Sequence, residues 1–216
     1  MPPQAPIDVH TGLEAARLGV YVHFPYCLSK CPYCDFASTA ARQVPDERYT
    51  EAILTELQAR LAAYGLAGRE VHSIFIGGGT PSLWAPSSVA RVLDALGRHL
   101  RVASRCEITL EANPGAADAE RFAAYRAAGV NRLSMGVQSF EPSTLATLGR
   151  AHDGATAVKA YEAARRAGFD NVSMDFIYGV HGQTEAQVEA DARAAVALGS
   201  EHLSAYALTL DKASLA

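Results

Sequence analysis

The 216-residue sequence lacks the features that mark membrane, secreted and nucleic-acid-binding proteins. No apolar stretch reaches the length of a membrane span. The segment from Met1 to Gly12 has neither the basic nor the apolar region of a secretory signal peptide. A net charge of −4, with no basic run interleaved with aromatic residues, argues against a nucleic-acid partner. We therefore expect a cytoplasmic globular protein without a transmembrane segment.

Cysteine is scarce, and its distribution is uneven. Three of the four cysteines, Cys27, Cys31 and Cys34, form a C-x3-C-x2-C pattern directly after the apolar run Val20–Phe24. So few cysteines suit a reducing compartment, and three clustered thiols would leave one unpaired in a disulfide scheme. Three thiolates can instead hold three irons of a [4Fe–4S] cluster, whose usual protein complement is four. The pattern predicts a cluster with one iron open to a small molecule.

A structural zinc site is the alternative interpretation of this loop, with His23 as the fourth ligand. Structural zinc usually joins two ligand pairs from separate segments, and no second CxxC or His-x3-5-His pair follows in this sequence. Both interpretations stay open at this point. Metal analysis would separate them, because a zinc protein contains no acid-labile sulfide.

Short apolar runs alternate with amphipathic helices along the chain. The strand candidates are Val20–Phe24, Ser73–Ile76, Glu107–Glu111, Arg132–Val137, Val172–Ile177 and Leu203–Leu208. The helix candidates are one with Tyr49, Ile53, Leu54, Leu57 and Leu61 on one face, one with Val89, Val92, Leu93 and Leu96 on one face, and three at about Asp118–Ala128, Gly154–Ala167 and Glu185–Leu198. This alternation predicts an α/β fold, a partial TIM-like (β/α)6 barrel, with a doubly wound sheet as the alternative.

Residues 1–18 are expected to form a flexible lead-in and residues 19–216 one core domain. The chain stops just after the sixth strand candidate. We therefore expect a fragment, truncated after the sixth strand, that lacks its last helix and a C-terminal domain.

A weak internal repeat supports the βα interpretation. Similar segments that start at Ala128-Gly129, Ala167-Gly168 and Leu198-Gly199 each lead into a strand candidate. Each copy corresponds to a helix end, a glycine cap and the next strand. The copies recur at the spacing of a βα unit, so the repeat is one of supersecondary structure.

Chemistry in parallel α/β folds sits at the carboxyl ends of the strands, where unusual residues of this sequence also fall. The second strand candidate is followed by Gly77-Gly78-Gly79-Thr80-Pro81. No Lys-Ser/Thr pair follows it and the sequence has no GxGxxG, so neither a P-loop nor a dinucleotide fingerprint is present. The segment is either a plain glycine turn or a place where the backbone approaches a ligand closely.

Single polar residues lie at or after the other strand ends. Glu111 could accept hydrogen bonds from hydroxyls or an ammonium group, or be an exposed strand-end charge. Gln138 is a candidate ligand-binding amide or a turn-stabilising one, and Arg150 is a carboxylate partner or a solvated loop charge. Asp175 lies inside an apolar strand, where a carboxylate is costly unless it is paired, so it is a stronger candidate than a surface aspartate.

Histidines and aromatic residues near these motifs have two interpretations each. His23 and His152 either act as ligands or only pack and hydrogen-bond beside the cysteines. Tyr33, Phe36 and Trp84 either line a ligand pocket or belong to the core.

Together these motifs resemble one branch of the radical S-adenosylmethionine (SAM) family. The segments that carry the likeness are 21–27, 31–36, 77–81, 111–114, 136–140, 148–152 and 175–179, within about Gly19 to Leu210. The pattern resembles the oxygen-independent coproporphyrinogen III oxidase family and, within it, the haem-chaperone branch.

The resemblance implies residues for each cofactor. It implies that Cys27, Cys31 and Cys34 hold the [4Fe–4S] cluster and that SAM takes the open iron. It implies SAM contacts at Tyr21, Tyr33, Gly78, Gly79, Thr80, Glu111, Gln138, Arg150 and Asp175, with weaker matches at Ile177 and Thr209. It also implies an electron donor protein, because a reduced cluster gives one electron to SAM.

The sequence departs from the oxidases at Phe36, where the oxidases carry another cysteine, and its lead-in is short. The Cys-Asp-Phe pattern is that of the haem-chaperone branch. We therefore expect a protein that binds haem and passes it to a haem-acceptor protein. One alternative is an oxidase that converts two propionates of coproporphyrinogen III, a porphyrinogen, to vinyl groups. The other is a zinc-stabilised barrel without redox chemistry.

Overall fold

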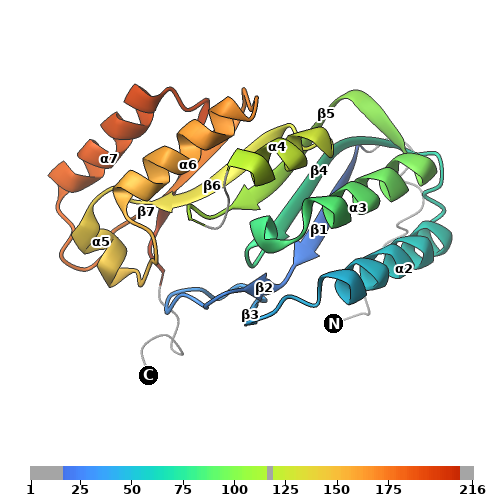
Figure 1. Ribbon diagram of the computed structural model, residues 1–216, viewed down its shortest axis with the longest axis horizontal. Coiled ribbons are helices and arrows are strands. Elements are labelled where there is room, and N and C mark those ends of the chain that lie inside the picture. Colours follow the sequence, from blue (N-terminus) through green and yellow to red (C-terminus); the bar gives the residue numbers. More distant parts are fainter. Residues whose placement is uncertain (1–16, 116–118, 210–216) are drawn as a thin grey trace, which may run out of the picture.

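Six parallel strands form one curved, open sheet in the computed structural model, which describes residues 17–115 and 119–209 (Figure 1). The strands are β1 (Leu18–Phe24), β4 (Glu70–Gly78), β5 (Arg101–Ala112), β6 (Arg132–Gln138), β7 (Val172–Tyr178) and β8 (His202–Ala207). They lie in chain order, β1-β4-β5-β6-β7-β8, and every neighbouring pair is parallel. A doubly wound sheet would need a reversal of strand order. The partial-barrel prediction is therefore confirmed, and the doubly wound alternative is wrong.

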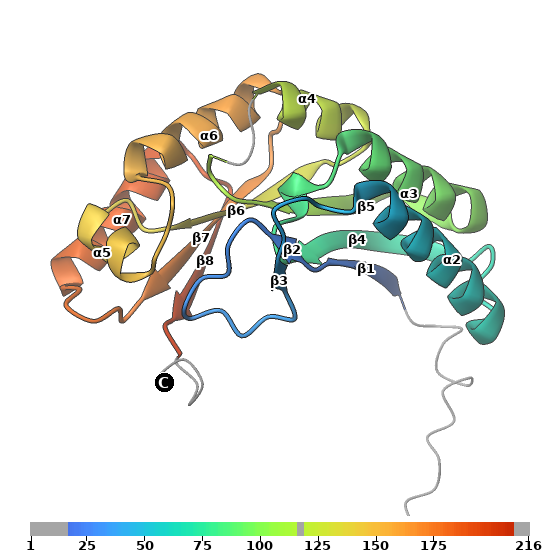
Figure 2. The same ribbon diagram turned by 60° about the horizontal axis from the view of Figure 1, so that its bottom comes forward.

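The helices lie along the convex outer side of the sheet (Figure 2). They are α2 (Asp46–Tyr64), α3 (Pro86–His99), α4 (Ala119–Ala127), α5 (Pro142–Thr147), α6 (Gly154–Arg166) and α7 (Glu185–Leu198), with a 3-10 turn, η1 (Pro81–Leu83). A short parallel pair, β2 (Tyr26–Cys27) and β3 (Thr39–Ala40), follows β1. Among the described residues, no helix combines the length and the apolar character needed to cross a membrane.

The main core fills the space between the sheet and the helices. Helix α3 buries Val89 and Leu96 there, as its apolar stripe predicts. The rings of Phe24 and Trp84 stack with centroids 5.3 Å apart, and Trp84 Nε1 donates a hydrogen bond to Thr50 Oγ1 at 3.0 Å. Trp84 is thus a core residue, which decides between its two interpretations.

The glycines of the internal repeat end three helices in the same way. Gly129, Gly168 and Gly199 have φ angles of 107°, 86° and 79°, the left-handed region that glycine adopts without strain. Each donates its N–H to the carbonyl three residues earlier, at 3.0 to 3.1 Å. The next residue donates to the carbonyl five residues earlier, which completes a Schellman-type end. The predicted helix–cap–strand repeat is confirmed.

Several boundaries and short elements differ from the sequence expectation. Strand β5 starts at Arg101 and not at Glu107, because Arg101 pairs with Glu70 of β4 in register and through an ion pair at 2.6 Å. The short elements β2, β3, η1 and α5 carry no apolar periodicity that could predict them. The start expected for α4 at Asp118, residues 1–16 of the predicted lead-in and Leu210 lie outside the described residues.

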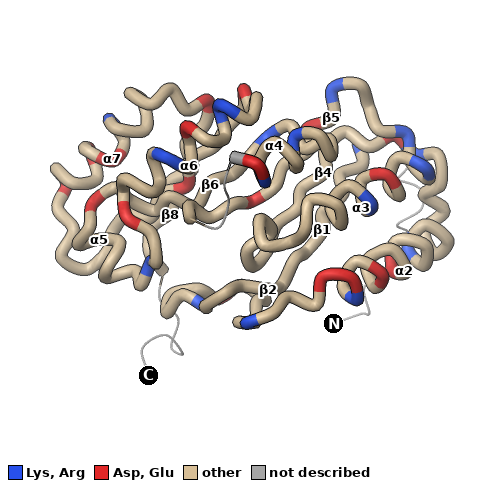
Figure 3. Tube along the Cα trace, viewed as in Figure 1, with Lys and Arg blue, Asp and Glu red and all other residues tan. Residues whose placement is uncertain are grey.

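Charged side chains of both signs are interspersed over the helices and the connecting turns (Figure 3). The strands carry few of them, and the start of α2 carries a run of acidic residues. The cavity described below is lined by five charged side chains: Glu111 and Asp175 belong to strands, and Lys30, Asp35 and Arg150 belong to loops.

Candidate functional site

A cavity of about 560 Å³ opens at the carboxyl ends of the strands, bounded on one side by the loop between β2 and β3. Figure 2 shows this loop on the concave side of the sheet, near the ends of β7 and β8. The predicted residues that line the cavity are Cys27, Cys31, Tyr33, Cys34, Gly78, Gly79, Thr80, Glu111, Gln138, Arg150, Asp175, Ile177 and Thr209. The fold thus brings together residues that are more than one hundred positions apart in the chain, as the 119 positions between Cys31 and Arg150 illustrate.

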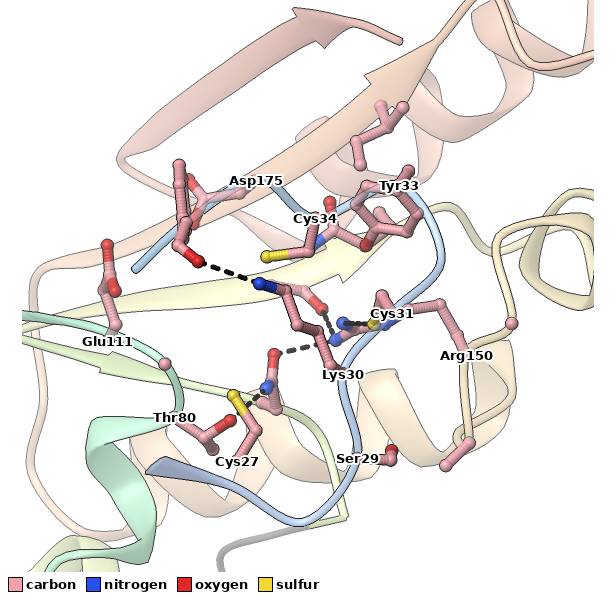
Figure 4. A pocket seen from close by; sticks show the side chains of 18 of the residues that line it. Cys27, Ser29, Lys30, Cys31, Tyr33, Cys34, Thr80, Glu111, Arg150 and Asp175 are labelled. Carbon is pink, nitrogen blue, oxygen red and sulfur yellow. Dashed lines mark hydrogen bonds between the residues drawn. The ribbon is translucent and has the colours of Figure 1, made fainter. Parts of the chain in front are cut away.

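Three free thiols line the cavity from this one loop. The short β2–β3 pair closes the base of the loop, where Ala41 N–H donates to Cys27 O at 2.8 Å. Within the loop, Cys34 N–H donates to Cys31 O at 3.0 Å, and Lys30 Nζ donates to Phe36 O at 3.1 Å. Figure 4 shows the sulfur atoms of the three cysteines on different sides of the cavity.

His23 does not face these thiols. Its Nδ1 lies 3.1 Å from Tyr21 Oη, and its Nε2 lies 2.7 Å from Ala37 O, so both ring nitrogens already have partners. In the described part of the chain, no group of three or more His, Cys, Asp or Glu side chains is arranged to hold a single metal ion. The zinc interpretation therefore lacks its fourth ligand in this structure.

Arg150 connects the cysteine loop to the strand ends. Its Nη1 lies 3.5 Å from Cys31 Sγ, and its Nη2 donates to Asn113 Oδ1 at 2.7 Å and to Gly136 O at 3.0 Å. Asn113 Nδ2 in turn donates to Thr80 Oγ1 at 3.2 Å (Figure 4). This network links the loop with the ends of β4, β5 and β6. Arg150 Nε is buried without a partner among the described residues, which leaves one donor for a ligand.

The loop also packs on the far side of the cavity. Tyr33 contacts a small apolar cluster that includes Leu148 and Ile177. Burial is the largest cause that raises the pKa of Tyr33 to about 12, so its hydroxyl stays protonated and can donate a hydrogen bond. Gly149, at φ 64°, lies where a Cβ would come within 3.1 Å of Pro32 Cδ, which explains a glycine directly before Arg150.

The glycine segment after β4 is required by packing. A Cβ at Gly79 would lie 2.6 Å from Tyr26 O, and one at Gly78 would lie 2.7 Å from the ring of His23. Gly78 also has a φ of 123° and donates its N–H to Glu111 Oε2 at 2.9 Å. The chain therefore needs these glycines to pass close to β1 and β2, and the same close passage exposes the backbone to the cavity.

Two carboxyl groups in the cavity wall, those of Glu111 and Asp175, lie in surroundings that disfavour their charged form. Burial raises the pKa of Glu111, while the Gly78 N–H lowers it and the nearby Asp175 raises it further. Burial also raises the pKa of Asp175, although Ser134 Oγ donates to its Oδ2 at 2.8 Å and favours the charged form. Both side chains can accept hydrogen bonds from a cationic or hydroxyl-bearing ligand.

Gln138 has the only positive φ of a non-glycine residue in the described part of the chain, at 66°. Such a conformation costs free energy for a side chain of this kind and persists only when its surroundings impose it. It ends β6 and turns the chain beside the cavity that the residue lines.

The structure differs from the sequence analysis at a few positions. Tyr21 lies outside the cavity lining, with its side chain 59 % exposed and its ring stacked on Phe75. His152 and Phe36 line the cavity, whereas His23 does not. Two residues with central hydrogen bonds, Asn113 and Ser134, were not assigned by sequence reasoning, although Asn113 follows directly after the strand end that contains Glu111.

The sequence of this chain is similar to a known superfamily and to several named proteins. The sequence description of the radical SAM superfamily matches residues 21–195. Proteins named heme chaperone HemW are 42 % identical over 197 residues in Haemophilus influenzae, 42 % over 199 in Escherichia coli and 39 % over 213 in Mycobacterium tuberculosis. These alignments cover 90, 92 and 96 % of this chain, and 51, 52 and 54 % of the relatives. The chain thus spans about half the length of the curated relatives it matches.

Solved structures give the same placement. The structure of coproporphyrinogen III oxidase, HemN, from Escherichia coli is described as a radical SAM enzyme. It is 29 % identical, with a TM-score of 0.81, and the alignment covers 89 % of this chain and 44 % of that one. Methylornithine synthase, PylB, is 15 % identical with a TM-score of 0.63 over 91 % of this chain and 55 % of its own, which is a likeness of fold alone.

Proposed function

Since this chain belongs to the radical SAM superfamily, we propose that Cys27, Cys31 and Cys34 hold a [4Fe–4S] cluster beside a SAM-binding cavity. One observation carries the proposal: three free thiols from one loop line the same cavity as the polar residues of several strand ends. The superfamily implies both cofactors, and the assignment of residues to them is ours.

The residues present fit a cluster. Iron–sulfur clusters take cysteine thiolates, and a cluster is wide enough to need its ligands on different sides, as the three sulfur atoms lie here (Figure 4). Three protein ligands leave one iron for a ligand from solution. When bound, the reduced cluster would supply one electron to SAM, from a donor protein that we expect in the cytoplasm.

The cavity wall also fits SAM, which carries an ammonium, a carboxylate, a sulfonium and ribose hydroxyls. Arg150 has a buried free Nε, which suits a carboxylate. Glu111 and Asp175 supply acceptors for the ammonium or the hydroxyls. Gln138 and Thr80 line the same wall with neutral polar groups. The contact proposed for Tyr21 rests on the family resemblance alone, because that side chain lies outside the lining.

For the whole protein we propose a haem chaperone, which binds haem and transfers it to an acceptor protein. The similarity to proteins named heme chaperone HemW supports this, as does Phe36 at the position where the related oxidases carry another cysteine. A coproporphyrinogen III oxidase is the second candidate, favoured by the 29 % identity to HemN. Both candidates act on a tetrapyrrole.

The cofactor proposal is tested by anaerobic reconstitution with iron and sulfide, followed by EPR of the reduced protein with and without SAM. We expect a [4Fe–4S]+ signal that changes shape on addition of SAM. One equivalent of zinc without acid-labile sulfide would overturn it. For the whole protein, absorbance titration with haem should show saturable binding. Formation of a vinyl-bearing product from coproporphyrinogen III would replace the chaperone with the oxidase.

A further inference from the structure

The strained turn that carries Gln138 is held by residues from outside its own strand. The turn runs from Val137, in the last residues of β6, to Phe140, before α5. With φ at 66°, Gln138 would relax towards an ordinary conformation if neighbouring bonds did not fix the residues on each side. The bonds that do so identify the residues on which the position of the Gln138 side chain depends.

Asp191 of α7 holds the residues after Gln138. Its Oδ2 accepts a hydrogen bond from Ser139 Oγ at 2.6 Å, and its Oδ1 accepts one from Phe140 N–H at 2.7 Å. Asp191 is 6 % exposed and Ser139 is fully buried, so water does not compete for these bonds. Burial raises the pKa of Asp191, while the two donors favour its charged form.

Other contacts hold the turn from the opposite side. His152 Nε2 donates to Val137 O at 3.0 Å, directly before Gln138. Gly154 lies so close to Phe140 that a Cβ there would be 2.5 Å from Phe140 O. The turn is therefore fixed both before and after Gln138, and Asp191 supplies the only charged side chain among these contacts.

Helix α7 lies on the outer side of the sheet (Figure 2), and none of its residues lines the cavity. In its described residues only Asp191 and Ala195 are buried, while the partly buried Leu198 also packs against the core. A carboxylate is therefore one of the few side chains through which the helix docks. A buried carboxylate is an expensive way to dock a helix, because an apolar residue would avoid the desolvation penalty. The desolvation penalty has a structural reason if the carboxylate holds the turn at Gln138 in place.

We propose that Asp191 is a positioning residue for the SAM site, which acts through Ser139 and Phe140 to hold the Gln138 side chain at the cavity wall. The proposal rests on the proposed function, in which Gln138 contacts SAM. It extends the site to a helix that does not line the cavity.

The test measures the SAM dissociation constant by equilibrium dialysis on the reconstituted protein, together with iron and sulfide content and melting temperature. The main variants are Asp191→Ala and the milder Ser139→Ala. Asp191→Asn is the conservative variant, because its amide can accept from Phe140 N–H and donate to Ser139 Oγ. Glu189→Gln is the matched control, since it removes from the same helix an exposed carboxylate that lies 3.5 Å from Arg193 Nη2.

We expect Asp191→Ala to weaken SAM binding about 10- to 100-fold, the range found when a supporting partner of a ligating residue is removed. Iron and sulfide content should stay unchanged, Asp191→Asn should restore most of the affinity, and Glu189→Gln should bind as the wild type does. In a Gln138→Ala background, Asp191→Ala should cause no further loss of SAM affinity, because the effects of two substitutions that act through one contact are not additive.

Two outcomes separate this inference from the proposed function. The positioning role is overturned, and the proposed function stands, if the wild type binds SAM and both Asp191→Ala and Ser139→Ala bind it equally well. The same holds if Asp191→Ala weakens SAM binding equally with and without Gln138. If the wild type carries a cluster but binds no SAM, the proposed function fails and the positioning role falls with it. Should Asp191→Ala not fold, Ser139→Ala decides.

Discussion

The two faces of the sheet are made by alternate residues of the same strands, and they follow different rules. In β6, Leu133, Met135 and Val137 point into the core between sheet and helices, where each is fully buried. The residues between and after them, Ser134 and Gln138 among them, line the cavity. The outer face is thus selected for apolar volume, whereas the inner face is selected for polar groups that can bind a ligand.

Strand β7 repeats the comparison with a charge. Val172 and Met174 are fully buried on the outer face. On the inner face Ser173 Oγ lies 2.9 Å from His202 Nδ1, and Asp175 accepts from the Ser134 hydroxyl. Buried parallel strands usually carry apolar residues on both faces. The polar inner face is therefore a departure that the outer core has to stabilise, and it is the side of the sheet that lines the cavity.

The sharpest test of the comparison is to remove one thiol from the cavity and one from the outer core. Cys34→Ala should abolish the cluster, because two remaining ligands do not hold it, and iron and sulfide should fall to background. Cys106→Ala removes a buried thiol of the outer core and should leave the cluster content unchanged. Iron and sulfide analysis with EPR measures both. A full cluster in Cys34→Ala would contradict the assignment of the loop.

Adjacent residues of β6 allow the next largest effect to be compared directly. Leu133→Ala should lower the free energy of unfolding by about 2–5 kcal/mol, because a buried outer-face side chain leaves a cavity. Ser134→Ala should cost only about 1 kcal/mol, the contribution of one hydrogen bond to Asp175. SAM binding should be weakened more by Ser134→Ala than by Leu133→Ala. Urea unfolding and SAM dialysis on both variants check this, and equal stability losses would remove the distinction between the faces.

The parts of this fold that could be predicted from the sequence are those with local signals. The strand candidates, the glycine helix ends and the cysteine loop all depend on residues within one or two turns of each other. Asn113, Ser134 and Asp191 could not be recognised, because their decisive hydrogen bonds reach partners 37, 41 and 52 positions away. Short elements such as α5 contain too few residues to show a period.

The pH dependence of stability should also separate the faces. Burial raises the pKa of Asp175 above its ordinary 3.8 and that of Glu111 above its ordinary 4.5, so the folded protein holds these protons more tightly than the unfolded chain. Their contribution to stability is therefore greatest at low pH and is lost as pH rises through the folded pKa values. Melting curves should show that the melting temperature falls less over this pH range for Asp175→Asn than for the wild type. An identical slope would show that Asp175 is charged in the folded state without penalty.

Outer-face substitutions provide the control for this experiment. Leu133→Ala changes no titratable group, so the variant should be less stable than the wild type by the same amount at every pH in the range. Asp175→Asn should also weaken SAM binding, because the amide has lost the charge that suits a cation. Higher stability with weaker binding would show that the carboxylate is kept for its ligand.

The smallest effect comes from positions that belong to neither face. Gly168→Ala should lower the free energy of unfolding by about 1 kcal/mol, because φ is 86° there although the space around a Cβ is open. Gly97→Ala, in the exposed interior of α3 with equally open space, should raise it by up to about 1 kcal/mol. Urea unfolding of both variants measures the pair. Since neither Cβ meets a neighbour, opposite signs would show that backbone conformation alone sets the effect of a side chain at each position. A gain at Gly168 would mean that the helix end relaxes without its left-handed cap.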